Sequence, residues 1–153
     1  MLEFVVAALV SLGLILFCTA MFYEILAHVW LILPRLEKHP RLQILLTVLS
    51  AFTGHTVAVW AFGLTSYVMS YHLGFGEISG TVGHGMMDYV YFSAVTYSSL
   101  GLGDVYPTGG LRMLCAVEAI MGLLLIGWTV TFTYLVTDKY LAHKRRKHTG
   151  NKD

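Results

Sequence analysis

The chain consists of three long apolar runs separated by short polar stretches. The runs cover Phe4–Leu33, Leu42–Leu73 and Met113–Val136, and their only formal charges are Glu24 in the first and Glu118 in the third. Each run exceeds the roughly 20 apolar residues that a helix needs to cross the hydrocarbon core of a membrane. The pattern therefore predicts three membrane-spanning helices.

The composition also indicates a membrane protein. Of the 153 residues, 56% are hydrophobic and 12% are charged, and this charged fraction is about half that of a soluble domain. An ordinary water-soluble domain is therefore excluded, and we expect an all-α membrane protein. Cys18 and Cys115 lie inside apolar segments, where we expect each to be a small packing residue rather than half of a disulfide.

A different pattern separates the second run from the third. The aromatic segment Asp88–Tyr97 has the length of a half-helix and is followed by Ser98-Ser99-Leu100-Gly101-Leu102-Gly103-Asp104. Glycines at alternate positions accept positive φ at no steric cost, so successive carbonyl groups can point to one side. A column of such oxygens replaces the water shell of a dehydrated monovalent cation. A half-helix, a carbonyl column and a spanning helix in this order indicate a cation-selective pore.

The segment Asp88–Val136, about a third of the chain, resembles the pore loop and inner helix of the tetrameric potassium channels. Their usual filter reads Thr-Val-Gly-Tyr-Gly-Asp, and the matching residues here are Ser99, Leu100, Gly101, Leu102, Gly103 and Asp104. The Gly-Leu-Gly form is similar to one filter of the tandem-pore potassium channels. The resemblance implies a homotetrameric pore of the bacterial type, to which this chain adds one N-terminal helix.

The apolar runs and the resemblance together predict how the chain is organised. We expect an N-terminal transmembrane helix over residues 1–33, a cytoplasmic linker over 34–41, a pore domain over 42–138 and a basic cytoplasmic tail over 139–153. Within the pore domain we expect an outer helix over 42–73, a re-entrant pore helix over 88–98, a filter over 99–104 and an inner helix over 111–138. The Gly-rich stretch Gly74–Gly85 predicts a plain external loop.

The resemblance also implies which residues handle the ion. The main-chain carbonyls of Ser99, Leu100, Gly101 and Leu102 would coordinate dehydrated K⁺. The Ser99 hydroxyl would assist, and Gly103 would complete the filter. Asp104 would concentrate cations at the outer mouth; the alternative is that it only caps a turn. No cofactor is expected, and K⁺ is the permeant ion.

Three filter positions depart from the common pattern of that family. Leu102 lacks the hydroxyl that anchors the usual tyrosine, Ser99 replaces threonine, and Val95 stands where some bacterial members have a glutamate that pairs with the mouth aspartate. We therefore expect the filter to be supported mainly by the packing of Tyr91, Phe92, Val95 and Tyr97. Packing is less directional than hydrogen bonding, so the sequence predicts weaker discrimination between K⁺ and Na⁺, or a filter that collapses at low K⁺.

The third run contains candidates for a cavity and a gate. Four residues share one face at helical spacing and are expected to line the cavity and its inner mouth: Leu123, Ile126, Val130 and Tyr134. A lipid-facing stripe is the alternative. Val130 and Tyr134 are the gate candidates, because hydrophobic constrictions close by dewetting. Gly122 is either a hinge or a site of close packing.

Two acidic residues have predicted structural roles. Glu118 is expected near the outer interface, where it is solvated, pairs with Arg112 of its own or a neighbouring chain, or clamps the filter region. Asp88 is expected to cap the pore helix or to lie in its first turn, where the helix dipole favours an acid.

Basic residues predict the orientation in the cell membrane. The linker contains Arg35, Lys38 and Arg41, and the tail contains Lys139 and the cluster Lys144-Arg145-Arg146-Lys147, so both should be cytoplasmic. The N-terminus and the loop before the pore helix should then be outside. The tail either binds anionic lipid or serves as an ordinary anchor.

Other functions stay open at this stage. A weakly selective cation channel and a non-conducting membrane subunit share the same fold. A membrane protein that binds haem through His28 and His55 is a rival of another class, and the alternative for His55 is a neutral, hydrogen-bonded packing residue. We expect neither an enzyme nor a nucleic-acid-binding protein, because the sequence shows no phosphate loop and no nucleophile with a nearby base.

Overall fold

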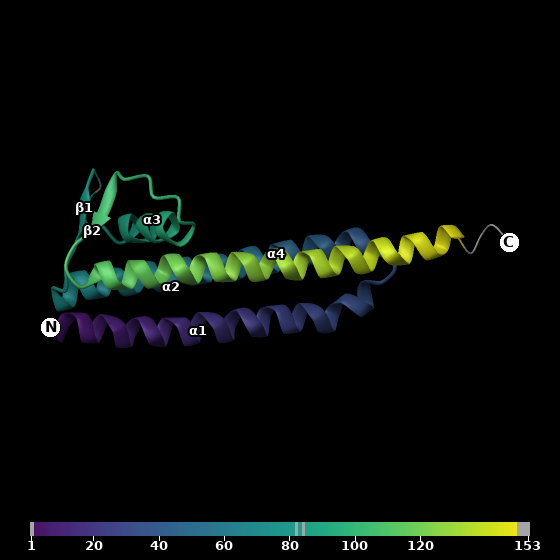
Figure 1. Cartoon of the computed structure of the whole chain (residues 1–153), viewed down its shortest axis with the longest axis horizontal. Coiled ribbons are helices and arrows are strands. Elements are labelled where there is room, and N and C mark those ends of the chain that lie inside the picture. Colours follow the sequence, from purple (N-terminus) through teal and green to yellow (C-terminus); the bar gives the residue numbers. More distant parts are fainter. Residues whose placement is uncertain (1, 82, 84, 150–153) are drawn as a thin grey trace.

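The computed structural model describes residues 2–81, 83 and 85–149. Three long helices run side by side (Figure 1): α1 (Leu2–Ile32), α2 (Pro40–Leu73) and α4 (Leu111–Thr149). With a rise of about 1.5 Å per residue, each is longer than the roughly 30 Å hydrocarbon core. All three contain a stretch that is long and apolar enough to cross a membrane.

The ends of α2 follow from local sequence. A 3₁₀ turn, η1 (Leu33–Leu36), follows α1, and Pro40 then begins α2, a position where its missing N–H costs no hydrogen bond. The side chain of Gln43 ties the linker to α2 by donating to the carbonyl of Leu33 over 2.6 Å. At the other end, Gly74 adopts a left-handed conformation with φ of 64° and ends the helix.

A short helix and two short strands lie between α2 and α4. They are β1 (Ile78–Gly80), α3 (Met86–Tyr97) and β2 (Val105–Pro107). In Figure 1 they lie on one side of α2 and α4, while α1 lies on the other side. The strands are at the end where α2 finishes and α4 begins. The chain therefore enters and leaves this region at the same end of the helices, as a re-entrant loop does.

The strand pair corrects the predicted plain loop. β1 and β2 are antiparallel, with Ile78 opposite Pro107 and Gly80 opposite Val105. Part of the stretch Gly74–Gly85 thus pairs with the residues that directly follow Asp104. Strands of three residues are too short to show the alternation of apolar and polar residues by which a strand is recognised in a sequence.

The buried core joins all four helices. α1 contributes Cys18 and Phe22, and the other members of the cluster include Phe62, Tyr89, Phe92, Tyr97, Leu114, Met121 and Leu125. Both Cys18 and Cys115 are free and buried. Many large apolar side chains on the outer faces, such as Leu16, Phe52 and Leu124, stay exposed. An apolar core beneath an apolar surface confirms the prediction of an all-α membrane protein with three spanning helices.

Three predicted boundaries differ from the structure by two residues or more. α2 begins at Pro40, two residues before the expected start of the outer helix. α3 begins at Met86, two residues before the expected start of the pore helix. α4 continues past residue 138 and ends at Thr149, inside the predicted tail. Helical periodicity does not end where apolar residues give way to basic ones, because lysine and arginine are good helix formers.

Candidate functional site

The short helix α3 is fixed at its start by Asp88. Its carboxylate oxygen Oδ2 accepts a hydrogen bond from the backbone N–H of Gly85 over 3.0 Å. This contact satisfies one of the free N–H groups at the helix start, and the negative charge lies where the helix dipole favours it. Asp88 thus occupies the first turn of α3, as the sequence predicts.

Two glycines let α3 approach its neighbouring helices closely. A Cβ at Gly63 in α2 would lie 2.9 Å from the Cα of Val90. A Cβ at Gly122 in α4 would overlap the backbone carbonyl of Tyr97, the last residue of α3. The geometry therefore supports close packing as the reason for Gly122, while a hinge there stays a prediction.

The end of α3 has a defined cap. The N–H of Ser99 donates to the carbonyl of Thr96 over 2.9 Å, and the N–H of Leu100 donates to the carbonyl of Val95 over 3.1 Å. These two bonds form a Schellman motif, whose left-handed position usually holds glycine. Here Ser99 holds it, with φ of 55°. A non-glycine residue in this conformation costs about 1–2 kcal/mol and often marks a functional segment.

Positive φ then recurs at every second residue. Ser99 has φ of 55°, Gly101 of 56° and Gly103 of 80°. The sequence predicts the glycine positions, whereas the contribution of Ser99 becomes visible only in the structure. The alternation is the backbone form in which successive carbonyl groups can face one side.

This segment has little cover from its own chain. The side chains of Leu100 and Leu102 are 65% and 57% exposed. A Cβ at Gly101 or Gly103 would meet no other atom within 4 Å. Irregular backbone at membrane depth is tolerated only where it is enclosed by protein or lines a hydrated path. The exposed segment is therefore suited to enclosure by further protein.

The outer end of the segment is held by hydrogen bonds. The carbonyl of Asp104 accepts from the N–H and the hydroxyl of Thr81, over 3.1 and 3.2 Å. The hydroxyl of Tyr91 donates to Asp104 Oδ2 over 2.9 Å. Strand β2 begins at the next residue and pairs with β1. Backbone and side chain of Asp104 are thus both anchored.

These contacts add hydrogen bonds to the packing that the sequence predicts as the main support of residues 99–104. Among the four predicted support residues, Tyr91 acts through its hydroxyl, and Val95 through its carbonyl. Phe92 and Tyr97 are buried in the core shared with the other helices. The Tyr91–Asp104 bond was missed because a sequence gives no sign of which aromatic hydroxyl lies near a carboxylate 13 residues away.

Glu118 is buried behind α3. Its side chain has no exposed surface, and its Oε1 is hydrogen-bonded to the hydroxyl of Ser93. The same hydroxyl contacts the carbonyl of Val59 over 2.8 Å, so the group joins α2, α3 and α4. The geometry fits the predicted clamp near the filter region.

Two other predicted environments of Glu118 were wrong, namely solvation and a pair with Arg112 of its own chain, while a pair with Arg112 of a neighbouring chain stays a prediction. Glu118 is not solvated, and Arg112 is exposed on α4. The two residues are six apart, which places them about 240° around the helix from each other. They cannot meet on one face of the same chain.

The arrangement of the two histidines does not fit a haem site. Both ring nitrogens of His55 lie within hydrogen-bond distance of hydroxyl groups, Tyr97 Oη at 2.8 Å and Thr129 Oγ1 at 3.0 Å. His28 is exposed on α1, with Nδ1 2.7 Å from the carbonyl oxygen of Glu24. An iron ligand needs a free ring nitrogen, and His55 offers none. The arrangement fits the packing histidine that the sequence left as the alternative.

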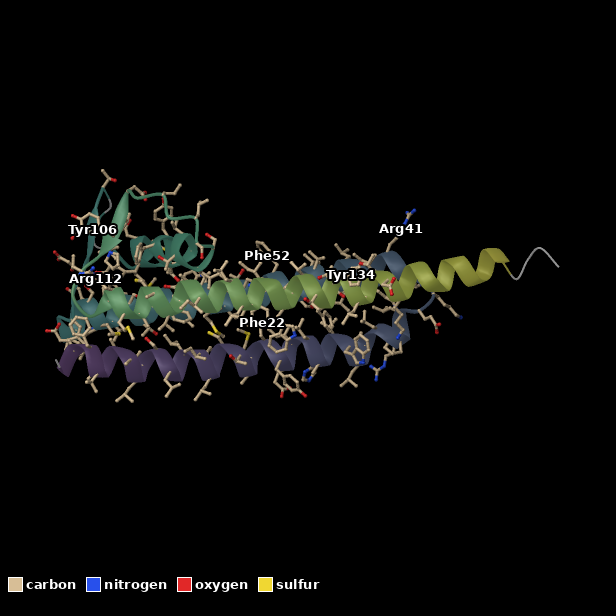
Figure 2. All side chains as sticks on the ribbon, in the orientation of Figure 1. Phe22, Arg41, Phe52, Tyr106, Arg112 and Tyr134 are labelled. Carbon is tan, nitrogen blue, oxygen red and sulfur yellow. The ribbon has the colours of Figure 1, made fainter. Side chains whose placement is uncertain are left out.

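The candidate cavity face divides into two groups. Leu123, Val130 and Tyr134 are 58%, 63% and 67% exposed within the chain. Ile126 is half-buried and packs against the core. In Figure 2, Tyr134 lies far along α4 from Tyr106 and Arg112, which mark the end with the strands. The exposed face therefore extends from the level of α3 toward the opposite end.

The arrangement combines two long helices with a re-entrant helix and a segment of alternating φ between them. Comparison with protein families matched residues 44–137, more than half of the chain, to the family described as an ion channel. The chain belongs to the ion channel family. No curated protein and no solved structure gave a significant match. Helix α1 lies outside the matched residues of this channel.

The end of the channel near the tail is described only in part. Lys139 Nζ lies 5.3 Å from the centre of the Trp30 ring, a cation–π contact that joins α4 to α1. The side chains of Lys144, Arg145, Arg146 and Lys147, for which lipid binding was predicted, lie outside the described residues.

Proposed function

We propose that this channel is a homotetramer that conducts K⁺ passively across the cell membrane, through a filter formed by residues 99–104. The observation that carries the proposal is the positive φ at Ser99, Gly101 and Gly103 in a segment that its own chain leaves exposed. Each chain contains one such segment, so a closed ring of carbonyls needs several copies. Four is the number that the resemblance to potassium channels implies.

The remaining site residues take roles along this path. Carbonyls of Ser99, Leu100, Gly101 and Leu102 coordinate K⁺ in the proposal, and Asp104 concentrates cations at the mouth. The exposed face of α4 with Leu123, Val130 and Tyr134 lines the cavity below the filter. Val130 and Tyr134 form the hydrophobic gate. Passive conduction needs no chemical step, so the protein is not an enzyme in this proposal.

The arrangement of charges supports an orientation. In Figure 2, Arg41 lies at the end opposite Tyr106 and Arg112, and Figure 1 shows the last turns of α4 extending past that same end. The basic linker and the tail therefore belong to one side. We place that side in the cytoplasm, following the positive-inside rule. The N-terminus and the strands are then outside, and the tail meets the anionic lipids of the inner leaflet.

A weakly selective channel is the second candidate, and one observation favours it. The side chain of Leu102 is 57% exposed and has no hydroxyl to hold the middle of the filter. The hydrogen bonds found at Asp104 support the outer end instead.

Ion flux into liposomes tests both candidates. The purified full-length chain should carry K⁺ current that Ba²⁺ blocks, whereas protein-free liposomes should carry none. Reversal potentials in mixed K⁺ and Na⁺ should show a preference for K⁺. This preference should be up to about tenfold weaker than in a channel whose residue at the position of Leu102 is anchored by a hydrogen bond, since one such bond contributes on the order of 1 kcal/mol. No flux would refute conduction by this chain alone. Very high selectivity that persists at low K⁺ would refute the weakened filter.

The Tyr91–Asp104 bond makes a separate prediction at the mouth. Tyr91→Phe removes the donor to Asp104 and should lower K⁺ selectivity severalfold, because the outer anchor loses its side-chain contact. Measured reversal potentials check it. Tyr23→Phe, which removes the same hydroxyl from a tyrosine on the exposed face of α1, is the control and should leave selectivity unchanged.

The same bond predicts a pH dependence. The hydrogen bond to Asp104, then partial loss of hydration and the negative charge of that carboxylate, raise the pKa of Tyr91 above its usual range. A raised pKa means that the bond is intact at neutral pH and is lost as pH rises through that pKa, above about 10. Wild-type selectivity should therefore be constant from pH 7 to about 10 and fall only above it. A fall that begins near neutral pH would contradict the assignment.

A further inference from the structure

His55 connects three elements near the middle of the helices. It lies in α2, and its Nδ1 is 2.8 Å from the hydroxyl of Tyr97 in α3. Its Nε2 is 3.0 Å from the hydroxyl of Thr129 in α4. A neutral imidazole has one donor and one acceptor nitrogen, and each hydroxyl can serve either of them. The three side chains thus form one chain of hydrogen bonds, in which both ring nitrogens of His55 have a partner.

Tyr97 links this chain of bonds to the filter. It is the last residue of α3, and its carbonyl packs against Gly122 of α4. The next turn is held by carbonyls of Thr96 and Val95, which accept from the first two filter residues. We therefore expect a displacement of the Tyr97 side chain to move the residues from which the proposed filter starts.

Thr129 links the same chain of bonds to the inner half of α4. It lies seven residues beyond Gly122, about two helical turns further along nearly the same face. The gate candidate Val130 is the next residue, and the gate candidate Tyr134 follows five residues after Thr129. A movement of this half of α4 that displaces Thr129 must break its bond to His55 or carry the imidazole with it.

Helix α1 closes this network from the other side. Phe22 has no exposed surface, and its ring centre lies 4.8 Å from that of His55. Figure 2 shows Phe22 directed from α1 toward α2 and α4. A Cβ at Gly54 would lie 2.9 Å from the Phe22 ring, so a glycine at this position of α2 leaves room for the ring. Both hydrogen bonds of His55 are partly buried, and at reduced exposure to water a broken hydrogen bond costs more than it does in bulk water.

We propose that His55 is a positioning residue that couples the inner half of α4 to the start of the filter, and that α1 serves this coupling by holding His55 with Phe22. An electrical test of this coupling rests on the proposed conduction of K⁺, whereas a structural test of it does not. The proposal gives the N-terminal helix, which lies outside the part that matches the ion channel family, a role in gating.

The experiment compares single variants of the full chain in lipid nanodiscs. Tyr97→Phe and Thr129→Val remove one hydroxyl each with little change in shape, His55→Leu removes both contacts, and Phe22→Ala removes the cover. Matched controls are Phe17→Ala, on the exposed face of α1, and Thr53→Val, whose hydroxyl bonds the carbonyl of Leu49 in its own helix.

The structural readout is hydrogen exchange at the amides of Ser99 and Leu100, which donate to the end of α3. We expect these amides to exchange about tenfold faster in the four network variants, the factor that loss of one buried hydrogen bond gives. The controls should match the wild type. The double variant His55→Leu with Tyr97→Phe should exchange no faster than His55→Leu alone, because both changes break the same bond.

The electrical readout is single-channel recording in planar bilayers. Mean open time should change about tenfold in the network variants, while the conductance of an open channel stays constant. Wild-type exchange rates in both Tyr97→Phe and Thr129→Val would overturn the inference. If the wild type carries no current but the exchange rates change as expected, the proposed conduction fails and the coupling stands.

Discussion

Gly122→Ala is expected to reduce K⁺ flux through proteoliposomes by at least about tenfold, since overpacking costs about 1–3 kcal/mol in each chain of an assembly. The added methyl group would overlap the carbonyl of Tyr97, so α3 and α4 must move apart. Neither backbone can yield as a flexible side chain does. The filter that follows Tyr97 would shift with α3 in every subunit.

Gly127→Ala is the matched control for this variant. It lies five residues further along α4, and a Cβ there would meet no atom of the described part of the chain within 4 Å. Its flux should stay close to that of the wild type. Single-channel recording separates close packing from a hinge at Gly122. Altered open probability at unchanged selectivity would favour a hinge, whereas loss of selectivity would favour displacement of α3. Wild-type gating and selectivity in Gly122→Ala would refute both.

Gly101→Ala is expected to abolish selective K⁺ conduction. Gly101 has φ of 56°, and an L-residue in that conformation costs about 1–2 kcal/mol. Four copies around one axis would multiply this cost, so the filter would leave the alternating form. A Cβ at Gly101 meets no atom of its own chain within 4 Å. Within the chain, the effect therefore comes from the backbone and not from crowding.

Gly13→Ala controls for the loss of a glycine as such. Gly13 lies in α1 without positive φ, and a Cβ there also meets nothing within 4 Å. This variant should keep wild-type flux and reversal potential, and alanine even favours the helix by about 1 kcal/mol. Selective K⁺ current through Gly101→Ala would show that positive φ is not needed in the conducting form, and our account of the filter would be wrong.

The long helices and the alternating segment could be predicted because each is encoded locally. An apolar run of sufficient length has few structural alternatives in a membrane. Gly101 and Gly103 mark positions of positive φ by their residue type alone. Asp88 likewise marks the start of α3 by its position before an aromatic run.

The contacts that hold the site could not be predicted, because they join residues far apart in the chain. Tyr97 and His55 are 42 residues apart, and His55 and Thr129 are 74 apart. Ser93 and Glu118 are 25 apart. No periodicity relates such residues, so only the packing of the helices reveals them. A glutamate inside an apolar run nevertheless signals a function, and Glu118 does lie beside α3.

The cap at Ser99 shows how a local rule fails in an informative way. The left-handed position after a helix usually holds glycine, and the sequence therefore gave no reason to expect positive φ at a serine. The hydrogen bonds of Ser99 and Leu100 to the last turn of α3 enforce it. A serine that accepts this strain retains a hydroxyl at the inner end of the filter, where a glycine would have none.

The central claim is that several copies of residues 99–104 surround one axis and bind K⁺ through their main-chain oxygens. An experimental structure of the purified channel with Rb⁺ in place of K⁺ tests it most directly, because anomalous scattering locates Rb⁺ without reference to the protein. We predict a row of Rb⁺ peaks on a fourfold axis, within coordination distance of the carbonyl oxygens of Ser99, Leu100, Gly101 and Leu102. A monomer without a central path, or a segment 99–104 that faces lipid with no Rb⁺ beside it, would contradict the account.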